Sequence, residues 1–68
     1  MTVEPKFTIR AQDALSIEVL VHYLAAAQRY NLIAHSQEVR TAIAEFIVWQ
    51  NENPEKVKMP YHKHIPLM

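Results

Sequence analysis

The sequence predicts an all-α fold: an antiparallel two-helix hairpin with a short extended N-terminal segment and a proline-rich extended C-terminal tail, completed by homo-oligomerisation. Two stretches with helical spacing of apolar residues, joined by a short polar turn, predict the hairpin. The first stretch is apolar around about 220° of its circumference, roughly twice the arc of an ordinary surface helix. A chain of 68 residues cannot bury that surface alone, which predicts association with a second copy or another partner.

Composition narrows the class of protein further. The chain is one small domain, and because cysteine is absent neither a disulfide nor a thiolate zinc site reinforces its core. Seven basic and seven acidic residues give a formal net charge of zero, which disfavours duplex nucleic acid as the main ligand. The sequence shows neither a signal peptide nor an apolar stretch of about 18 residues. We therefore expect a cytoplasmic protein without a membrane partner.

Residues 1–15 are expected to form an extended arm, and residues 16–31 the first helix. Phe7 to Arg10 alternate apolar and polar side chains, as in a short edge strand or an extended segment across the helices. Ser16 is the candidate N-cap, and Glu18 follows in the first turn, where a negative charge favours the helix dipole. Asn31 is the candidate left-handed C-cap, because asparagine tolerates a positive φ and the chain contains no glycine.

Residues 36–52 are expected to form the second helix, with Ser36 or the residues just before it as its cap. Its apolar and polar residues occupy separate arcs, so it covers only one side of the first helix. The predicted core between the two helices contains Leu20, Leu24, Ile43 and Phe46. The remaining apolar side of the first helix is predicted to form the subunit contact, through Val19, Tyr23, Ala26 and Tyr30.

Residues 53–68 are expected to form the extended tail. Pro54 ends the second helix, because the residue before a proline is driven out of the α region. Three of the four prolines favour an extended backbone here, and the tail contains enough apolar residues for part of it to pack on a helix or on a neighbouring subunit. His62 and His64 could direct two imidazoles toward one metal ion, but without a third nearby ligand we expect no metal site.

The sequence contains no recognisable catalytic set. Ser16 and Ser36 are interpreted as caps, His35 as a capping residue in the turn, and His22 as a partner of Glu18 one turn earlier. We therefore expect no enzyme and no cofactor. Aromatic and basic residues nevertheless permit nucleotide binding, with Trp49 as one possible stacking surface. The candidate ligand-binding residues are Arg10, Gln12, Asp13, Lys58, Tyr61 and Lys63.

Several short motifs carry a resemblance to a known family. They are the segments 6–15, 38–40, 49–50, 57–60 and 62–64. With these motifs, the chain resembles a family of small uncharacterised proteins encoded by tailed bacteriophages, over about residues 6–66. Members of that family usually have glycine in place of Asn31 and an acidic residue in place of Tyr61. The resemblance implies an accessory phage protein in the cytoplasm of the host bacterium, and implies no particular activity.

Two classes of function fit these expectations. The first is an oligomeric small-ligand binder that sequesters a nucleotide-derived bacterial immune signal, favoured because the apolar surface predicts a stable oligomer with repeated clefts. The alternative is a protein-interaction module that inhibits or redirects a host protein through the surplus apolar face or the tail. Arg10 discriminates between them if it lies in an interface; the other interpretation is an edge-strand charge that discourages aggregation.

Overall fold

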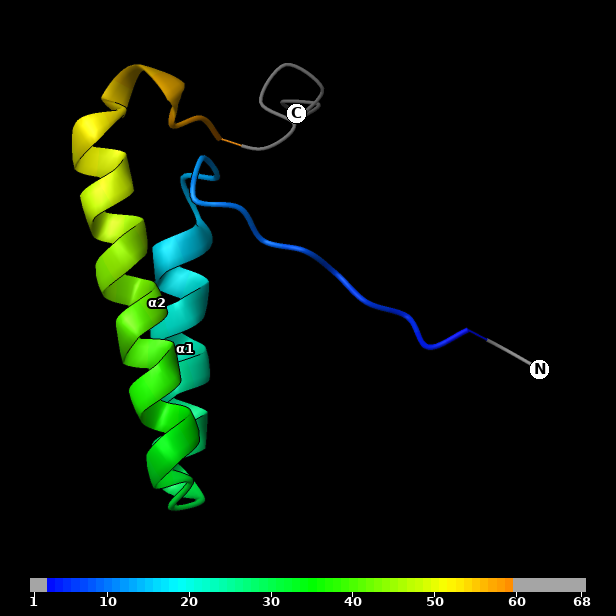
Figure 1. Cartoon of the computed structure of the whole chain (residues 1–68). Helices are drawn as coiled ribbons and strands as arrows, with labels where there is room; N and C mark the ends of the chain where they lie inside the picture. The colour runs from blue at the N-terminus through cyan, green and yellow to red at the C-terminus, as the bar shows by residue number, and fades with distance from the viewer. Residues whose placement is uncertain (1–2, 60–68) are drawn as a thin grey trace, which may run out of the picture.

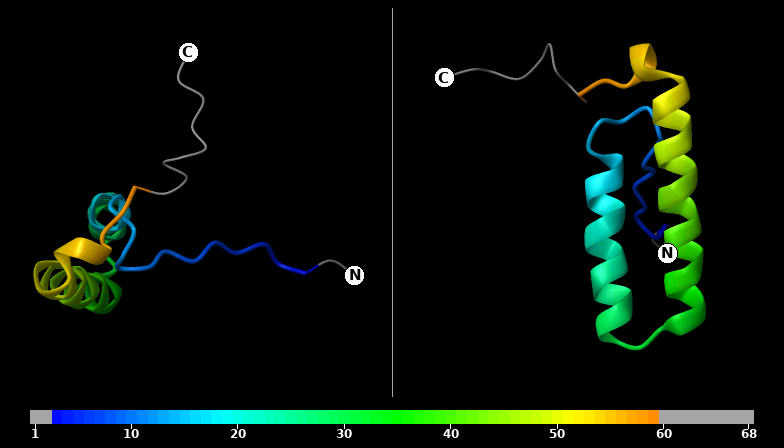
Figure 2. Two further views of the ribbon diagram at one scale, coloured as in Figure 1. Left: turned by 90° about the horizontal axis from the view of Figure 1, so that it is seen from above. Right: turned by 90° about the vertical axis from the view of Figure 1, so that its left-hand side faces the viewer.

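The chain folds as an antiparallel helical hairpin with an extended arm (Figure 1). A computed structural model describes residues 3–59, in which α1 spans Ser16–Arg29, α2 spans Ile33–Glu52 and a short 3-10 helix, η1, spans Pro54–Lys56. Residues 3–10 form the arm, which runs away from the helices near the start of α1 (Figures 1 and 2). The described residues contain no strand, only one isolated parallel bridge between Asp13 and Lys58. The predicted all-helical hairpin is thus confirmed.

The turn between the helices contains an asparagine in the left-handed region. Asn31 has a φ of 59°. Its backbone N–H donates to the Gln28 carbonyl at 3.0 Å, and the Leu32 N–H donates to the Ala27 carbonyl at 3.1 Å. These two bonds form a Schellman motif, which satisfies carbonyls that the end of α1 would otherwise leave free. The predicted role of Asn31 as a left-handed C-cap is confirmed.

The helix boundaries differ from the expected ones at the turn. Because Asn31 is left-handed, α1 ends at Arg29 instead of residue 31. The turn is completed within three residues, so α2 begins at Ile33, three residues before the expected start at 36. As a consequence, His35 lies in the first turn of α2 and not in the connection between the helices.

Ser16 and Ser36 are not the caps that the sequence predicts. Leu15 and Leu32 occupy the two N-cap positions, and neither makes a side-chain capping bond. Just before α1, Oδ1 of Asp13 accepts the N–H of Leu15 at 2.8 Å, which fixes the turn that leads into the helix. Both serines lie instead within the first turns and are buried. Their small side chains allow the two helices to approach closely.

The packing between the helices depends on few side chains. Among the apolar residues described, only Ala27 and Val39 are buried. The predicted core residues are half-buried, because a single pair of helices provides neighbours on one side only: Leu20, Leu24, Ile43 and Phe46. The core of a single copy is therefore open to solvent.

Large apolar side chains are exposed on both helices. Of the four predicted subunit-contact residues, Val19, Tyr23 and Tyr30 are exposed and Ala26 is half-buried; Tyr30 reaches 71% exposure. On α2, Ile33 is 75% exposed. Surfaces of this kind commonly mark protein–protein contacts. They provide the surface that homo-oligomerisation requires, and the assembly itself stays a prediction.

Candidate ligand-binding site

The connector before α1 and the segment after η1 pair through their backbones. The Ala14 N–H donates to the Lys58 carbonyl at 2.9 Å, and the Lys58 N–H donates to the Gln12 carbonyl, also at 2.9 Å. Pro54 starts η1 and turns the chain back after α2, because its fixed φ suits the first position of a helical turn. Segments distant in sequence therefore lie side by side at one end of the hairpin (Figure 1).

Gln50 fixes this junction to α2. Its side-chain Nε2 donates to the Ala11 carbonyl at 2.9 Å and lies 3.4 Å from both the Asp13 carbonyl and the Ser16 hydroxyl. Gln50 follows Val39 by about three turns, which places both residues on the side of α2 that faces α1. Sequence reasoning missed this role of Gln50, because its acceptors belong to a connector 34–39 residues away.

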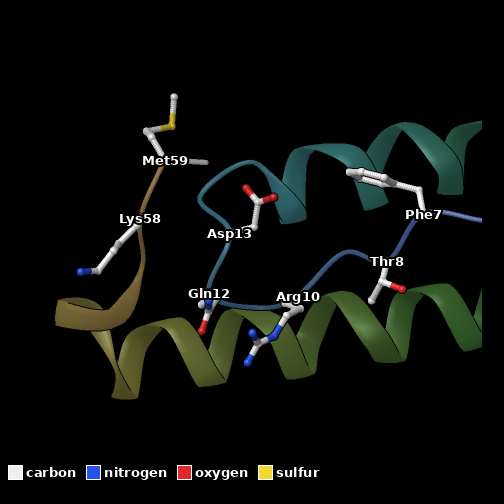
Figure 3. A pocket seen from close by; sticks show the side chains of 7 residues that line it. All are labelled: Phe7, Thr8, Arg10, Gln12, Asp13, Lys58 and Met59. Atoms are coloured by element: carbon white, nitrogen blue, oxygen red, sulfur yellow. The ribbon is translucent and has the colours of Figure 1, made fainter. Parts of the chain in front are cut away.

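An open cavity of about 290 Å³ lies where the arm, the connector and the segment after η1 meet. Its lining mixes cationic, polar and apolar side chains: Phe7, Thr8, Arg10, Gln12, Asp13, Lys58 and Met59. Figure 3 shows these side chains spread around the junction and not converging on one point. Such an open arrangement leaves room for a ligand, a second subunit or both.

Four of the six predicted ligand-binding residues line this one cavity. Arg10, Gln12 and Asp13 come from the arm and connector, and Lys58 comes from the segment after η1. Their grouping depends on the bridge between Asp13 and Lys58, which the sequence did not predict. The other two predicted residues, Tyr61 and Lys63, lie outside the described residues.

Two cationic side chains of the cavity, Arg10 and Lys58, have no carboxylate partner among the described residues. Within residues 3–59 no Arg or Lys side chain forms an ion pair with a carboxylate, so Asp13 neutralises neither Arg10 nor Lys58. One carboxylate oxygen of Asp13 already accepts the Leu15 N–H. The Asp13 side chain therefore supports the start of α1, and Arg10 and Lys58 are the groups suited to an anion.

Tyr23, His35 and Glu38 form a hydrogen-bonded series between the helices. The Tyr23 hydroxyl lies 2.8 Å from Nε2 of His35, and Nδ1 of His35 lies 3.3 Å from Oε1 of Glu38. The rings of Tyr23 and His35 meet edge to face, with centroids 5.5 Å apart. Sequence reasoning missed this series, because it placed His35 in the turn. All three side chains are exposed, so the series joins α1 to α2 at the surface.

Two further hollows lie on the helices. One, of about 130 Å³, is next to the interhelical turn and includes Arg40 and the buried Ser36, whose hydroxyl has no hydrogen-bond partner among the described residues. The other, of about 340 Å³, is named the α2 groove here and lies along the last three turns of that helix. It is lined by Ala44, Glu45, Val48, Trp49 and Glu52.

Comparison of the chain with models of protein families, with curated proteins and with solved structures gives no match. The resemblance to the phage family therefore stays a prediction. In the described part of the chain, no helix is long and apolar enough to span a bilayer. Residues 3–59 also contain no group of three side chains able to hold a metal ion, and His62 and His64 lie outside this range.

Proposed function

We propose that this protein is a non-enzymatic, homo-oligomeric binder of a small anionic ligand of the nucleotide type. The observation that carries this proposal is the cavity whose lining includes both Arg10 and Lys58, from opposite ends of the described chain. A phosphate group is buried at tolerable cost only against cations and hydrogen-bond donors. Arg10 and Lys58 provide the charges, and the Gln12 amide provides a further donor.

A nucleotide also has a planar base, which requires an apolar surface. Met59 provides such a surface at the edge of the same cavity. Capture of this kind is stoichiometric and needs no catalytic group. In an accessory protein of a phage, the ligand that we propose is a nucleotide-derived immune signal of the host bacterium, sequestered in its cytoplasm. The family resemblance supplies the phage source and the host cytoplasm in this proposal, and it supplies no activity.

Oligomerisation supports the same function. In a single copy the cavity is open, whereas small-ligand sites usually enclose most of the ligand surface. The exposed stripe of Val19, Tyr23 and Tyr30 offers a surface for a second copy. Because symmetric assembly repeats every site, one oligomer would hold several equivalent ligands.

Calorimetric titration of the full chain tests the proposal directly. The probes are cyclic dinucleotides, cyclic trinucleotides and cyclic ADP-ribose isomers, and we expect one class to bind and to be recovered unchanged after denaturation. Arg10→Ala and Lys58→Ala should each weaken binding about tenfold or more, because each removes a charge-assisted bond. Arg29→Ala and Lys56→Ala are matched controls outside the cavity and should leave affinity unchanged. No heat from any probe would contradict the proposal, as would equal losses in the control variants.

The second candidate is a protein-interaction module, and one observation favours it. Ile33 and Tyr30 are both highly exposed at the turn end of the hairpin, far along the helices from the cavity. A host protein that binds this end would bury them without using Arg10 or Lys58. Specific retention of one host protein that Ile33→Asp abolishes, together with no binding of the nucleotide probes, would favour this candidate.

A further inference from the structure

The α2 groove lies on the side of α2 that points away from α1. Gln50 faces α1, and at about 100° per residue Val48 and Glu52 lie about 160° and 200° around the helix from it. The groove therefore opens away from α1. Its apolar centre is accessible, since Val48 is 54% exposed. An apolar hollow between two carboxylates is suited to a segment that carries an apolar side chain beside a basic one.

The arm carries such side chains. Phe7 is 83% exposed, Lys6 precedes it, and the described residues of a single copy bury neither side chain. The arm cannot reach the α2 groove of its own copy by a short path. It is anchored where Gln50 binds the Ala11 carbonyl, on the side of α2 opposite to the groove, and it runs away from the helices from there (Figure 2).

Charge and length favour a second copy as the partner. Glu45 and Glu52 flank the groove, and within residues 3–59 neither they nor Lys6 takes part in an ion pair. Phe7 and Lys6 lie four and five residues before Ala11, where Gln50 holds the connector, so an extended backbone carries them about 13 and 17 Å from it at roughly 3.3 Å per residue. Packed helices lie about 8–10 Å apart, so both side chains can reach a helix of a second copy packed beside this one.

We propose that the arm of one copy binds in the α2 groove of a second copy, with Phe7 against Val48 and Trp49 and Lys6 facing the flanking glutamates. In a two-fold dimer this exchange is reciprocal, so each chain both donates an arm and accepts one. The inference rests on the proposed function only in requiring a homo-oligomer. It also brings Trp49 of the second copy toward the open side of the cavity, because Phe7 lies close to Arg10 in sequence.

Trp49 provides the first test, because it is the only tryptophan in the chain. When the full-length protein is concentrated from the nanomolar to the micromolar range, Trp49 emission should shift to shorter wavelength as Phe7 covers the ring. Phe7→Ala should abolish this shift and weaken dimerisation about 30-fold, as expected for loss of a central aromatic anchor. Val21 is another exposed apolar residue, and Val21→Ala is the control that should keep the Trp49 emission shift and the dimer affinity. Circular dichroism verifies that each variant is folded.

Mixing two defective variants separates exchange between copies from any contact within one copy. Phe7→Ala lacks a working arm and Val48→Asp lacks a working groove, so each alone should associate weakly. A mixed dimer retains one intact pair, and we expect an equimolar mixture to recover dimers and half of the Trp49 shift. Absence of recovery would overturn the proposal.

Charge reversal provides an independent test. Lys6→Glu should weaken the dimer several-fold, and combining it with Glu45→Lys and Glu52→Lys should restore the affinity. Combining Lys6→Glu with Glu18→Lys and Glu55→Lys, which lie outside the groove, should not restore the affinity. If Phe7→Ala dimerises like the wild type while Tyr23→Asp does not, arm exchange is wrong although the oligomer stands. Arg10→Ala should lose nucleotide binding while it still dimerises, because its Phe7 is intact, and this outcome keeps the two proposals separable.

Discussion

Replacing Gln50 by leucine tests how the cavity is attached to the helices. The change removes the 2.9 Å hydrogen bond from Nε2 of Gln50 to the Ala11 carbonyl. A hydrogen bond of this kind typically contributes about 1 kcal/mol to the free energy of unfolding. It also leaves the fully buried Ser16 hydroxyl without its nearby amide, and an unsatisfied buried polar group costs about 1–3 kcal/mol. We therefore expect Gln50→Leu to lower the free energy of unfolding by about 2 kcal/mol. That is a large fraction of the roughly 3–5 kcal/mol that such a small core supplies.

The assay is thermal unfolding followed by circular dichroism at one fixed protein concentration, because association changes the apparent midpoint. A loss of about 2 kcal/mol corresponds to a midpoint lower by about 8–16 °C in a domain of this size. Gln37→Leu is the matched control, because Gln37 is an exposed glutamine on the same helix, and it should shift the midpoint little. The affinity for the nucleotide probe should fall in Gln50→Leu as the connector loosens. Equal midpoints for the two variants would refute this reasoning.

Substitutions at three further positions test the fold. Asn31→Gly should raise stability by up to about 1 kcal/mol and Asn31→Ala should lower it by a similar amount, because only the first relieves the left-handed backbone; urea unfolding that ranks them in the opposite order would contradict the Schellman turn. Phe46→Ala should cost about 2 kcal/mol, below the 3–5 kcal/mol of a fully buried phenylalanine, because this ring is half-buried; an unchanged melting midpoint would place it in solvent. Tyr23→Phe removes the bond to His35 and should cost less than about 1 kcal/mol, because both groups are exposed; a larger loss in urea unfolding would show that the series stabilises the core.

The helical architecture was predictable because its signals are local. Helical spacing of apolar residues identified both helices, and Asn31 marked the turn because few residues other than glycine accept a positive φ. The serine caps were wrong for a related reason. A serine before a helix and a serine in its first turn give almost the same sequence signal, and only the packing of two helices decides that Ser16 and Ser36 are buried.

The candidate site was predictable in part. Arg10, Gln12 and Asp13 are close in sequence, so their grouping needed only a turn, whereas the approach of Lys58 depends on pairing between segments 45 residues apart. The hydrogen bond from Gln50 to the connector and the Tyr23–His35–Glu38 series both depend on the registry of α1 against α2. One-dimensional periodicity does not contain that registry. A shift of one residue in the start of α2 would turn His35 away from Tyr23.

We predict that one hairpin is incomplete and that a second copy covers its apolar surface. Sedimentation equilibrium of the full-length chain, with circular dichroism at the same concentrations, measures this most directly. We predict a helical homodimer or higher oligomer at micromolar concentration, with helix content falling as dilution separates the copies. A monomer that keeps its full helix content and melts cooperatively at every concentration would contradict this prediction.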